Sequence, residues 1–66
     1  MQITVNGQPQ QLATKATITQ LLAELGLDHK RIAIEVNKNV ISRSNHNEFR
    51  LSEGDYVEII QAVGGG

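Results

Sequence analysis

The sequence predicts an α+β fold in which one main helix covers one face of a mixed β-sheet. Three observations support this class. Apolar and polar residues alternate in several short segments, which is the pattern of strands with one buried face. A single segment, residues 18–25, has the apolar spacing of an amphipathic helix, and no second helical segment follows to cover the other face. The 66 residues allow one domain with a modest core.

The chain begins with a predicted β-hairpin. Residues 1–5 alternate apolar and polar side chains, and Asn6-Gly7 follows directly. This dipeptide is typical of two-residue hairpin turns, because both central residues need a positive φ. The return strand should cover residues 8–12. Pro9 has no N–H to donate to a neighbouring strand, so we expect this strand at an edge of the sheet.

The helix is predicted from both its ends and its apolar face. Thr17 and Gln20 have the spacing of a capping box, in which each side chain accepts a hydrogen bond from the backbone of the other. Gly26 stands where a left-handed C-terminal cap belongs, and Leu27 can fold back over the last turn. Four large aliphatic residues share one helical face: Ile18, Leu21, Leu22 and Leu25. Because a helix of about eight residues is not stable alone in water, it must pack on the sheet.

The second half of the chain contains three further predicted strands: residues 32–36, 40–41 and 56–62. Residues 37–39 and 52–55 have turn chemistry. Residues 42–49 are polar and without period, which predicts a loop containing at most one irregular helical turn. Leu51 is expected to anchor that loop to the core.

The order ββαββ followed by a last strand predicts the β-grasp arrangement of ubiquitin-like proteins. The first and last strands should pair in parallel at the centre of the sheet. In the last strand, Val57 and Ile59 alternate with Tyr56, Glu58 and Ile60. One of these two sets should therefore face the helix, and the other should lie on the uncovered face.

Composition excludes several classes of function. Six basic and seven acidic residues give a net charge of −1, without the basic stripe of a nucleic-acid-binding protein. The absence of cysteine excludes disulfides, thiolate metal sites and a cysteine nucleophile. His29 and His46 have no paired ligand spacing, so no metal site is predicted. Neither a signal peptide nor a membrane span is visible, so a cytoplasmic location is expected.

Enzyme activity is not expected from this domain. Ser42, Ser44, His46 and Glu48 contain the residue types of a nucleophile and its base. However, a catalytic triad takes its members from separate segments of a rigid scaffold. Four polar residues in one predicted loop indicate a solvated loop instead. A domain with one helix also lacks the walls of a deep substrate pocket.

The C-terminal residues are the remaining anomaly. We expect a folded domain over residues 1–63, followed by a flexible tail of Gly64, Gly65 and Gly66. Glycines cannot contribute to a core, and they weaken folding when ordered. A tail without Cβ atoms can thread a narrow cleft, and three residues reach at most about 10 Å. A carboxylate at its end could be activated as a mixed anhydride with AMP and then attacked by a sulfur nucleophile, giving a thiocarboxylate.

Four segments carry a specific resemblance to a known family. Residues 53–66 (EGDYVEIIQAVGGG), 1–7 (MQITVNG), 34–37 (IEVN) and 40–43 (VISR) are similar to the ThiS family of sulfur carriers in thiamine biosynthesis. The similarity covers the whole chain. Ser42 stands where the family commonly has proline, which affects a loop and leaves the tail unchanged.

The resemblance implies a role for each tail residue and a set of partners. Gly66 would be adenylated by an E1-like ThiF adenylyltransferase and then converted to a thiocarboxylate with sulfur from a separate donor system. Gly64 and Gly65 would thread the partners' clefts, and a ThiG-like thiazole synthase would take the sulfur. ATP and magnesium would belong to the activating partner, so this chain would need no cofactor.

The partners must also recognise the folded body. Val63, Ile60 and Tyr56 are the predicted interface residues, because the uncovered sheet face beside the tail would expose them. Three alternatives stay open at this point. They are a sulfur carrier of the molybdopterin-synthase small-subunit type, a ubiquitin-like modifier that forms isopeptide bonds, and a non-catalytic β-grasp binding module.

Overall fold

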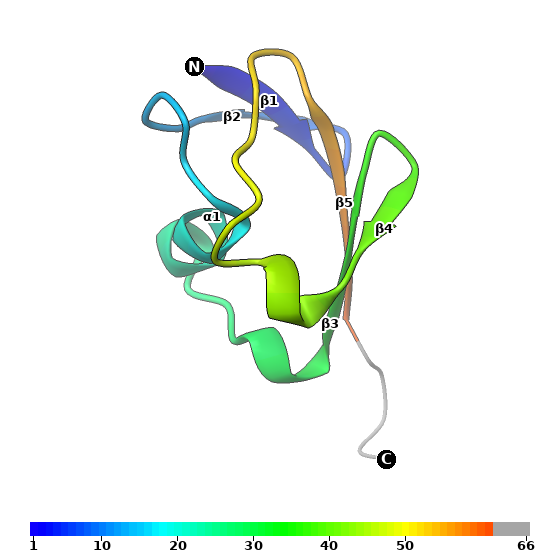
Figure 1. The fold of residues 1–66 in the computed structure, drawn as a ribbon. Helices are drawn as coiled ribbons and strands as arrows, with labels where there is room; N and C mark the ends of the chain where they lie inside the picture. Colours follow the sequence, from blue (N-terminus) through cyan, green and yellow to red (C-terminus); the bar gives the residue numbers. More distant parts are fainter. Residues whose placement is uncertain (62–66) are drawn as a thin grey trace.

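The computed structural model describes residues 1–61 and contains a five-stranded mixed sheet with one α-helix. The elements along the chain are β1 (Gln2–Val5), β2 (Gln8–Gln11), α1 (Ile18–Leu25), η1 (His29–Arg31), β3 (Ile32–Val36), β4 (Asn39–Ile41), η2 (Arg43–Asn45) and β5 (Tyr56–Gln61). The strand order is β2-β1-β5-β3-β4, and β1 pairs with β5 in parallel. The other three pairs are antiparallel. The predicted β-grasp topology is confirmed (Figure 1).

Local signals in the sequence account for both hairpins. Asn6 (φ 49°) and Gly7 (φ 82°) form the two-residue turn between β1 and β2, as predicted. Asn37 (φ 51°) and Lys38 (φ 71°) form an equivalent turn between β3 and β4. Pro9 lies in the edge strand β2, where its missing N–H costs no central hydrogen bond.

The predicted helix ends are also confirmed. The backbone N–H of Gln20 donates to Oγ1 of Thr17 at 3.2 Å, and the N–H of Thr17 donates to Oε1 of Gln20 at 2.8 Å. Gly26 adopts the left-handed conformation at φ 70°, which a residue with a Cβ rarely adopts. The N–H of Leu27 then donates to the carbonyl of Leu22 at 2.9 Å and closes the last turn.

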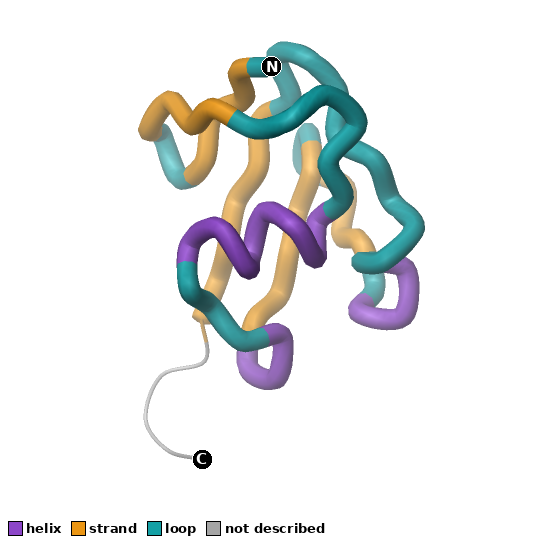
Figure 2. Tube along the Cα trace, turned by 90° about the vertical axis from the view of Figure 1, so that its left-hand side faces the viewer, coloured by secondary structure: helices purple, strands orange, loops and turns teal. Residues whose placement is uncertain are grey.

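The hydrophobic core lies between α1 and one face of the sheet, as Figure 2 shows for the arrangement of helix and strands. Its fully buried members include Ile18, Leu21 and Leu22 from the helix. The strands contribute the other face of the core: Ile3, Val5, Ile34, Val36, Val57 and Ile59. Leu51 is 2% exposed and anchors the long loop to this core, as predicted.

Two 3₁₀ turns lie at the end of the sheet toward which β5 runs (Figure 1). The turn η2 corresponds to the irregular helical turn expected in residues 42–49. The turn η1 was not predicted, because two adjacent basic residues after a helix, Lys30 and Arg31, indicate only an exposed charge pair. Both side chains are exposed, but the backbone around them closes a turn that Asp28 caps by accepting the N–H of Lys30 at 2.9 Å.

Within residues 1–61, no helix is both long and apolar enough to cross a lipid bilayer.

Candidate functional site

The open face of the sheet carries exposed apolar side chains. Tyr56 and Ile60 are 47% and 52% exposed, which confirms that these two candidates lie on the uncovered face. Their part in binding a partner stays a prediction. Val40 on β4 is 72% exposed and lies on the same face, opposite Glu35 of β3. The alternation of Val40 with the partly buried Ile41 could have identified it from the sequence.

Two acidic side chains lie in the middle of this face. Glu35 of β3 and Glu58 of β5 are directly opposite each other in the antiparallel register, and both are half-buried. Two pairs further along β5, and on the same face, Ala33 lies opposite Ile60. Like charges opposite each other on one face are unfavourable, so this arrangement does not serve the stability of the isolated domain.

Two asparagines in the hairpin turns position β5, from which the tail leaves. Asn6 accepts the N–H of Ile59 at its Oδ1 (2.8 Å) and donates from Nδ2 to the carbonyl of Ile59 at 3.3 Å. Asn37 accepts the N–H of Tyr56 at its Oδ1 at 3.0 Å. Each asparagine has a positive φ, so a residue chosen for its turn geometry also fixes the central strand. The sequence showed the turns but not these long-range contacts.

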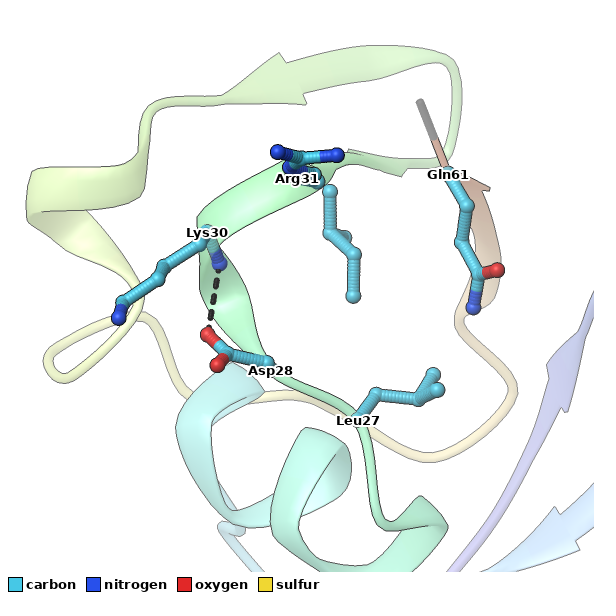
Figure 3. A pocket seen from close by; sticks show the side chains of 6 residues that line it. Leu27, Asp28, Lys30, Arg31 and Gln61 are labelled. Carbon is cyan, nitrogen blue, oxygen red and sulfur yellow. Dashed lines mark hydrogen bonds between the residues drawn. The ribbon is translucent and has the colours of Figure 1, made fainter. Parts of the chain in front are cut away.

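An open depression of about 350 Å³ lies where β5 ends (Figure 3). In Figure 3, Leu27 and Gln61 border the depression from adjacent sides, and the Lys30 side chain is directed away from it. The lining residues are Leu27, Asp28, Lys30, Arg31, Ile32 and Gln61. A second depression on the adjoining surface is lined by Arg31, Ile32, Ala33, Arg43 and Ile60. Basic residues and apolar side chains therefore lie beside the end of β5.

The tail itself lies outside the described residues. Val63, Gly64, Gly65 and Gly66 are predicted to contact or thread into partner proteins, and those roles stay predictions, as does the domain boundary after residue 63.

The prediction of a solvated loop is wrong for His46, which is 2% exposed. The loop folds over the start of α1, where the N–H of Thr19 donates to the carbonyl of His46 at 3.2 Å. Ser42, Ser44 and Glu48 are exposed, as a solvated loop requires. No local pattern could have separated His46 from these neighbours, because its burial depends on contacts with distant elements.

The structure also brings the two histidines together, a contact that their spacing in the sequence did not predict. Nδ1 of His46 lies 3.3 Å from Nδ1 of His29, and its Nε2 lies 3.2 Å from the carbonyl oxygen of Ile41. Burial lowers the pKa of His46 below 6.5; the bond to Ile41 opposes this effect, and the nearby His29 and Arg43 reinforce it. In the part of the chain that the structure describes, no group of three or more His, Cys, Asp or Glu residues could hold a metal ion.

The fold and the open face define a ubiquitin-like β-grasp domain, and comparisons with known proteins place it within that class. The sequence profile of the ThiS family matches residues 3–66, so the chain belongs to the ThiS family. The crystal structure of the thiamine biosynthesis protein ThiS from Geobacter metallireducens is 32% identical, with a TM-score of 0.84 over the full length of both chains.

The curated relatives include sulfur carriers and much longer thiazole synthases. The sulfur carrier protein ThiS of Bacillus subtilis (strain 168) is 40% identical over 50 residues, which are 76% of each chain. The thiazole synthase of Paramagnetospirillum magneticum is 32% identical over all 66 residues, but these are 20% of its length. The chain thus spans about a fifth of the thiazole synthases that it matches. The ThiS proteins of Bacillus subtilis and Escherichia coli are named as sulfur carriers, in agreement with the expectation that this domain is not itself an enzyme.

Proposed function

We propose that this protein is a sulfur carrier of thiamine biosynthesis that holds its sulfur on the carboxyl group of Gly66. The observation that carries the proposal is the Gly64-Gly65-Gly66 segment, which follows the central strand β5 of a ThiS-family domain at a distance of a few residues. Gly64 and Gly65 give this segment the slimness and conformational freedom needed to enter an active site. The domain is a carrier rather than a catalyst, and its chemistry takes place in the active sites of its partners.

The first step would be adenylation by a ThiF-like enzyme that binds ATP and magnesium. An oxygen of the Gly66 carboxylate attacks the α-phosphorus of ATP, and pyrophosphate leaves. A sulfur donor at the oxidation level of hydrosulfide then attacks the carbonyl carbon, forming the C–S bond while the C–O bond to AMP breaks. The products are AMP and the thiocarboxylate. Because these reactions consume ATP and take place between proteins, we expect them to occur in the cytoplasm.

The second partner would be a ThiG-like thiazole synthase that accepts the sulfur. Thiazole synthases that match this chain over a fifth of their length support such a partner, since they combine a domain of this kind with a larger protein. The open sheet face with Ile60 and Tyr56 would dock on the partners while the tail enters the active site. Val63 would extend this contact toward the tail.

Deletion of Gly66 tests the carboxyl chemistry directly. With the matching adenylyltransferase, the full chain should support ATP–pyrophosphate exchange, and the deletion variant should not. Urea unfolding of the two proteins should be identical, because the core ends before the tail. Replacing Gly66 with alanine is the matched control, since it keeps the chain length and adds one methyl group. Exchange by the deletion variant at the rate of the full chain would refute the proposal.

Intact-mass spectrometry of protein from the native host tests whether sulfur is carried. Sulfur in place of a carboxyl oxygen adds about 16 Da, the same increment as oxidation of Met1 to its sulfoxide. Alkylation separates the two, because a thiocarboxylate reacts with iodoacetamide and a sulfoxide does not. A native protein with Gly66 at its end that never carries an alkylatable increment, even when thiamine synthesis is induced, would contradict the proposal.

A further inference from the structure

His29 and His46 face each other at the open end of the β3–β4 hairpin, where η1 precedes β3 and η2 follows β4. His29 is the first residue of η1, and His46 caps the end of η2. Their Nδ1 atoms are 3.3 Å apart, and a second contact lies beside them, where the guanidinium of Arg43 donates to the carbonyl of Lys30 at 2.9 Å. The two 3₁₀ turns are thus held together at the end of the sheet where β5 terminates.

The hydrogen bond to β4 fixes the tautomer of His46. The carbonyl oxygen of Ile41 can only accept, so Nε2 of His46 must carry the hydrogen of that bond. A neutral imidazole has one N–H, so Nδ1 of neutral His46 presents a lone pair toward His29. His29 must therefore donate from its own Nδ1, and it can do so either as the neutral Nδ1–H tautomer or as the imidazolium.

The ring geometry supports a hydrogen bond that joins the two rings nitrogen to nitrogen. The ring centroids are 5.6 Å apart and the planes meet at 28°. The centroid separation equals the Nδ1–Nδ1 distance plus the two ring radii, so both nitrogens lie on the line between the centroids. Two imidazoles that chelate one tetrahedral metal ion would instead converge on it at an angle. This arrangement fits a single proton between the rings.

The number of protons on the pair decides whether this contact can exist. With His46 neutral, the contact holds whether His29 is neutral or charged. A proton on Nδ1 of His46 would place two N–H groups and two positive charges against each other. The titratable and charged groups that act on His46 are His29 from η1 and Arg43 from η2, and both oppose its protonation. The contacts from α1 and β4 are backbone groups, the N–H of Thr19 and the carbonyl of Ile41.

We propose that His29 and His46 form a proton-controlled clamp, which holds η1 against η2 while His46 is neutral and opens when His46 is protonated. The turn η1 supplies Arg31 to the lining of the depression at the end of β5. Opening of the clamp would therefore alter the surface at the end of β5 without disturbing the hydrophobic core. This inference concerns the conformation of the isolated protein and does not depend on the sulfur-carrier proposal.

The direction of the pH dependence follows from the lowered pKa of His46. The unfolded chain takes up this proton near pH 6.5, whereas the folded chain resists it to a lower pH. The stabilising effect of neutral His46 is therefore fully present above pH 6.5 and is lost as the pH falls from 6.5 through the folded pKa. One proton taken up by the unfolded state alone changes the folding equilibrium constant by at most about tenfold per pH unit.

Long-range ¹H–¹⁵N spectra of the imidazoles in the full chain test the clamp. At about pH 7.5, His46 should be the Nε2–H tautomer with a bare Nδ1, and His29 should carry a proton on Nδ1. On acidification the amide signals of residues 29–31 should shift in step with the protonation of His46. An Nδ1–H tautomer for neutral His46, or unchanged amide signals while His46 titrates, would overturn the proposal.

A matched pair of variants separates the clamp from a merely structural role of His29. The amide of His29→Gln can donate to neutral His46 or accept from protonated His46, so the η1 signals should stay nearly constant between about pH 7.5 and pH 5. His29→Leu can do neither, so its η1 signals at neutral pH should resemble those of the acidified wild type. His29 is half-buried and outside the core cluster, so both variants should fold. An acid response of His29→Gln equal to that of the wild type would refute the proton-controlled clamp.

Discussion

Neighbouring isoleucines on opposite faces of β5 allow the binding role of the open face to be separated from stability. Ile59 is 9% exposed and belongs to the core, whereas Ile60 is 52% exposed on the open face. A change at Ile59 should therefore act on folding. An equivalent change at Ile60 should act mainly on docking to the partner, if this face is the interface.

The magnitudes follow from these exposures. Full burial of an isoleucine side chain is worth about 1.5–3 kcal/mol, so burying the exposed half of Ile60 against a partner should contribute about 1–1.5 kcal/mol. Ile60→Asp loses this contribution and puts a carboxylate in its place, which must lose its water when the apolar part of a partner covers it. We expect at least a tenfold rise in Kd, since tenfold corresponds to about 1.4 kcal/mol. The free energy of unfolding should fall by about 1 kcal/mol, because half of the side chain is already in water.

Two controls bracket this result. Ile59→Ala should cost about 2–5 kcal/mol of stability. That is a large part of the roughly 3–10 kcal/mol expected for a domain of 66 residues. Val40→Asp places the same charge on the same face, but on β4, two strands from β5.

The assay is isothermal titration calorimetry with the ThiF-like adenylyltransferase, paired with urea unfolding of each variant. Docking centred on the tail side of the sheet predicts a large rise in Kd for Ile60→Asp and a small one for Val40→Asp. Equal Kd values for Ile60→Asp and the wild type, with both proteins folded, would remove Ile60 from the interface. A loss of binding that merely follows the loss of stability would show that the open face is not recognised directly.

Two further changes test how the fold is specified. Thr17→Ala removes the oxygen of the capping box and should lower the free energy of unfolding by about 0.5–2 kcal/mol. Thr17→Ser keeps this oxygen and should retain most of the stability of the wild type. Equal stability of all three proteins would show that this cap is unimportant. Glu58→Gln relieves the repulsion from Glu35 and should raise the free energy of unfolding by about 0.2–1 kcal/mol in low salt, and less in high salt. A stability decrease in low salt would mean that Glu58 has a favourable contact that the register does not reveal.

Most of the fold could be predicted because its signals are local. Asn6-Gly7 fixed the first hairpin, and Thr17 with Gly26 fixed the two ends of the helix. Pro9 placed its strand at the edge of the sheet, and the lack of a second helix implied an open face. Each of these inferences depends on the conformation of a few consecutive residues or on a simple count of elements, and tertiary contacts did not override them.

The missed features depend on contacts between distant residues. His46 belongs to a polar loop, and only the positions of His29, α1 and β4 make its environment buried. The acidic pair is similar, because Glu35 and Glu58 become neighbours only once the register between β3 and β5 is known. Alternation along a single strand assigns each residue to a face, but it cannot say which residue of the next strand lies opposite.

The open face of the sheet carries features that do not stabilise the isolated protein. The core lies on the helix side of the sheet and is closed by α1, so the side chains of the outer face contribute little to folding. The Glu35–Glu58 pair and the exposed Ile60 therefore reduce the free energy of unfolding by an amount that is small compared with the contribution of the core. Both features become favourable if a partner covers the face with apolar groups and a basic side chain, because the carboxylates then gain a counter-charge in a drier environment. A basic, partly apolar partner surface would therefore complement this face. We expect the salt dependence of binding to be weaker for Glu58→Gln than for the wild type, and an equal salt dependence would contradict this expectation.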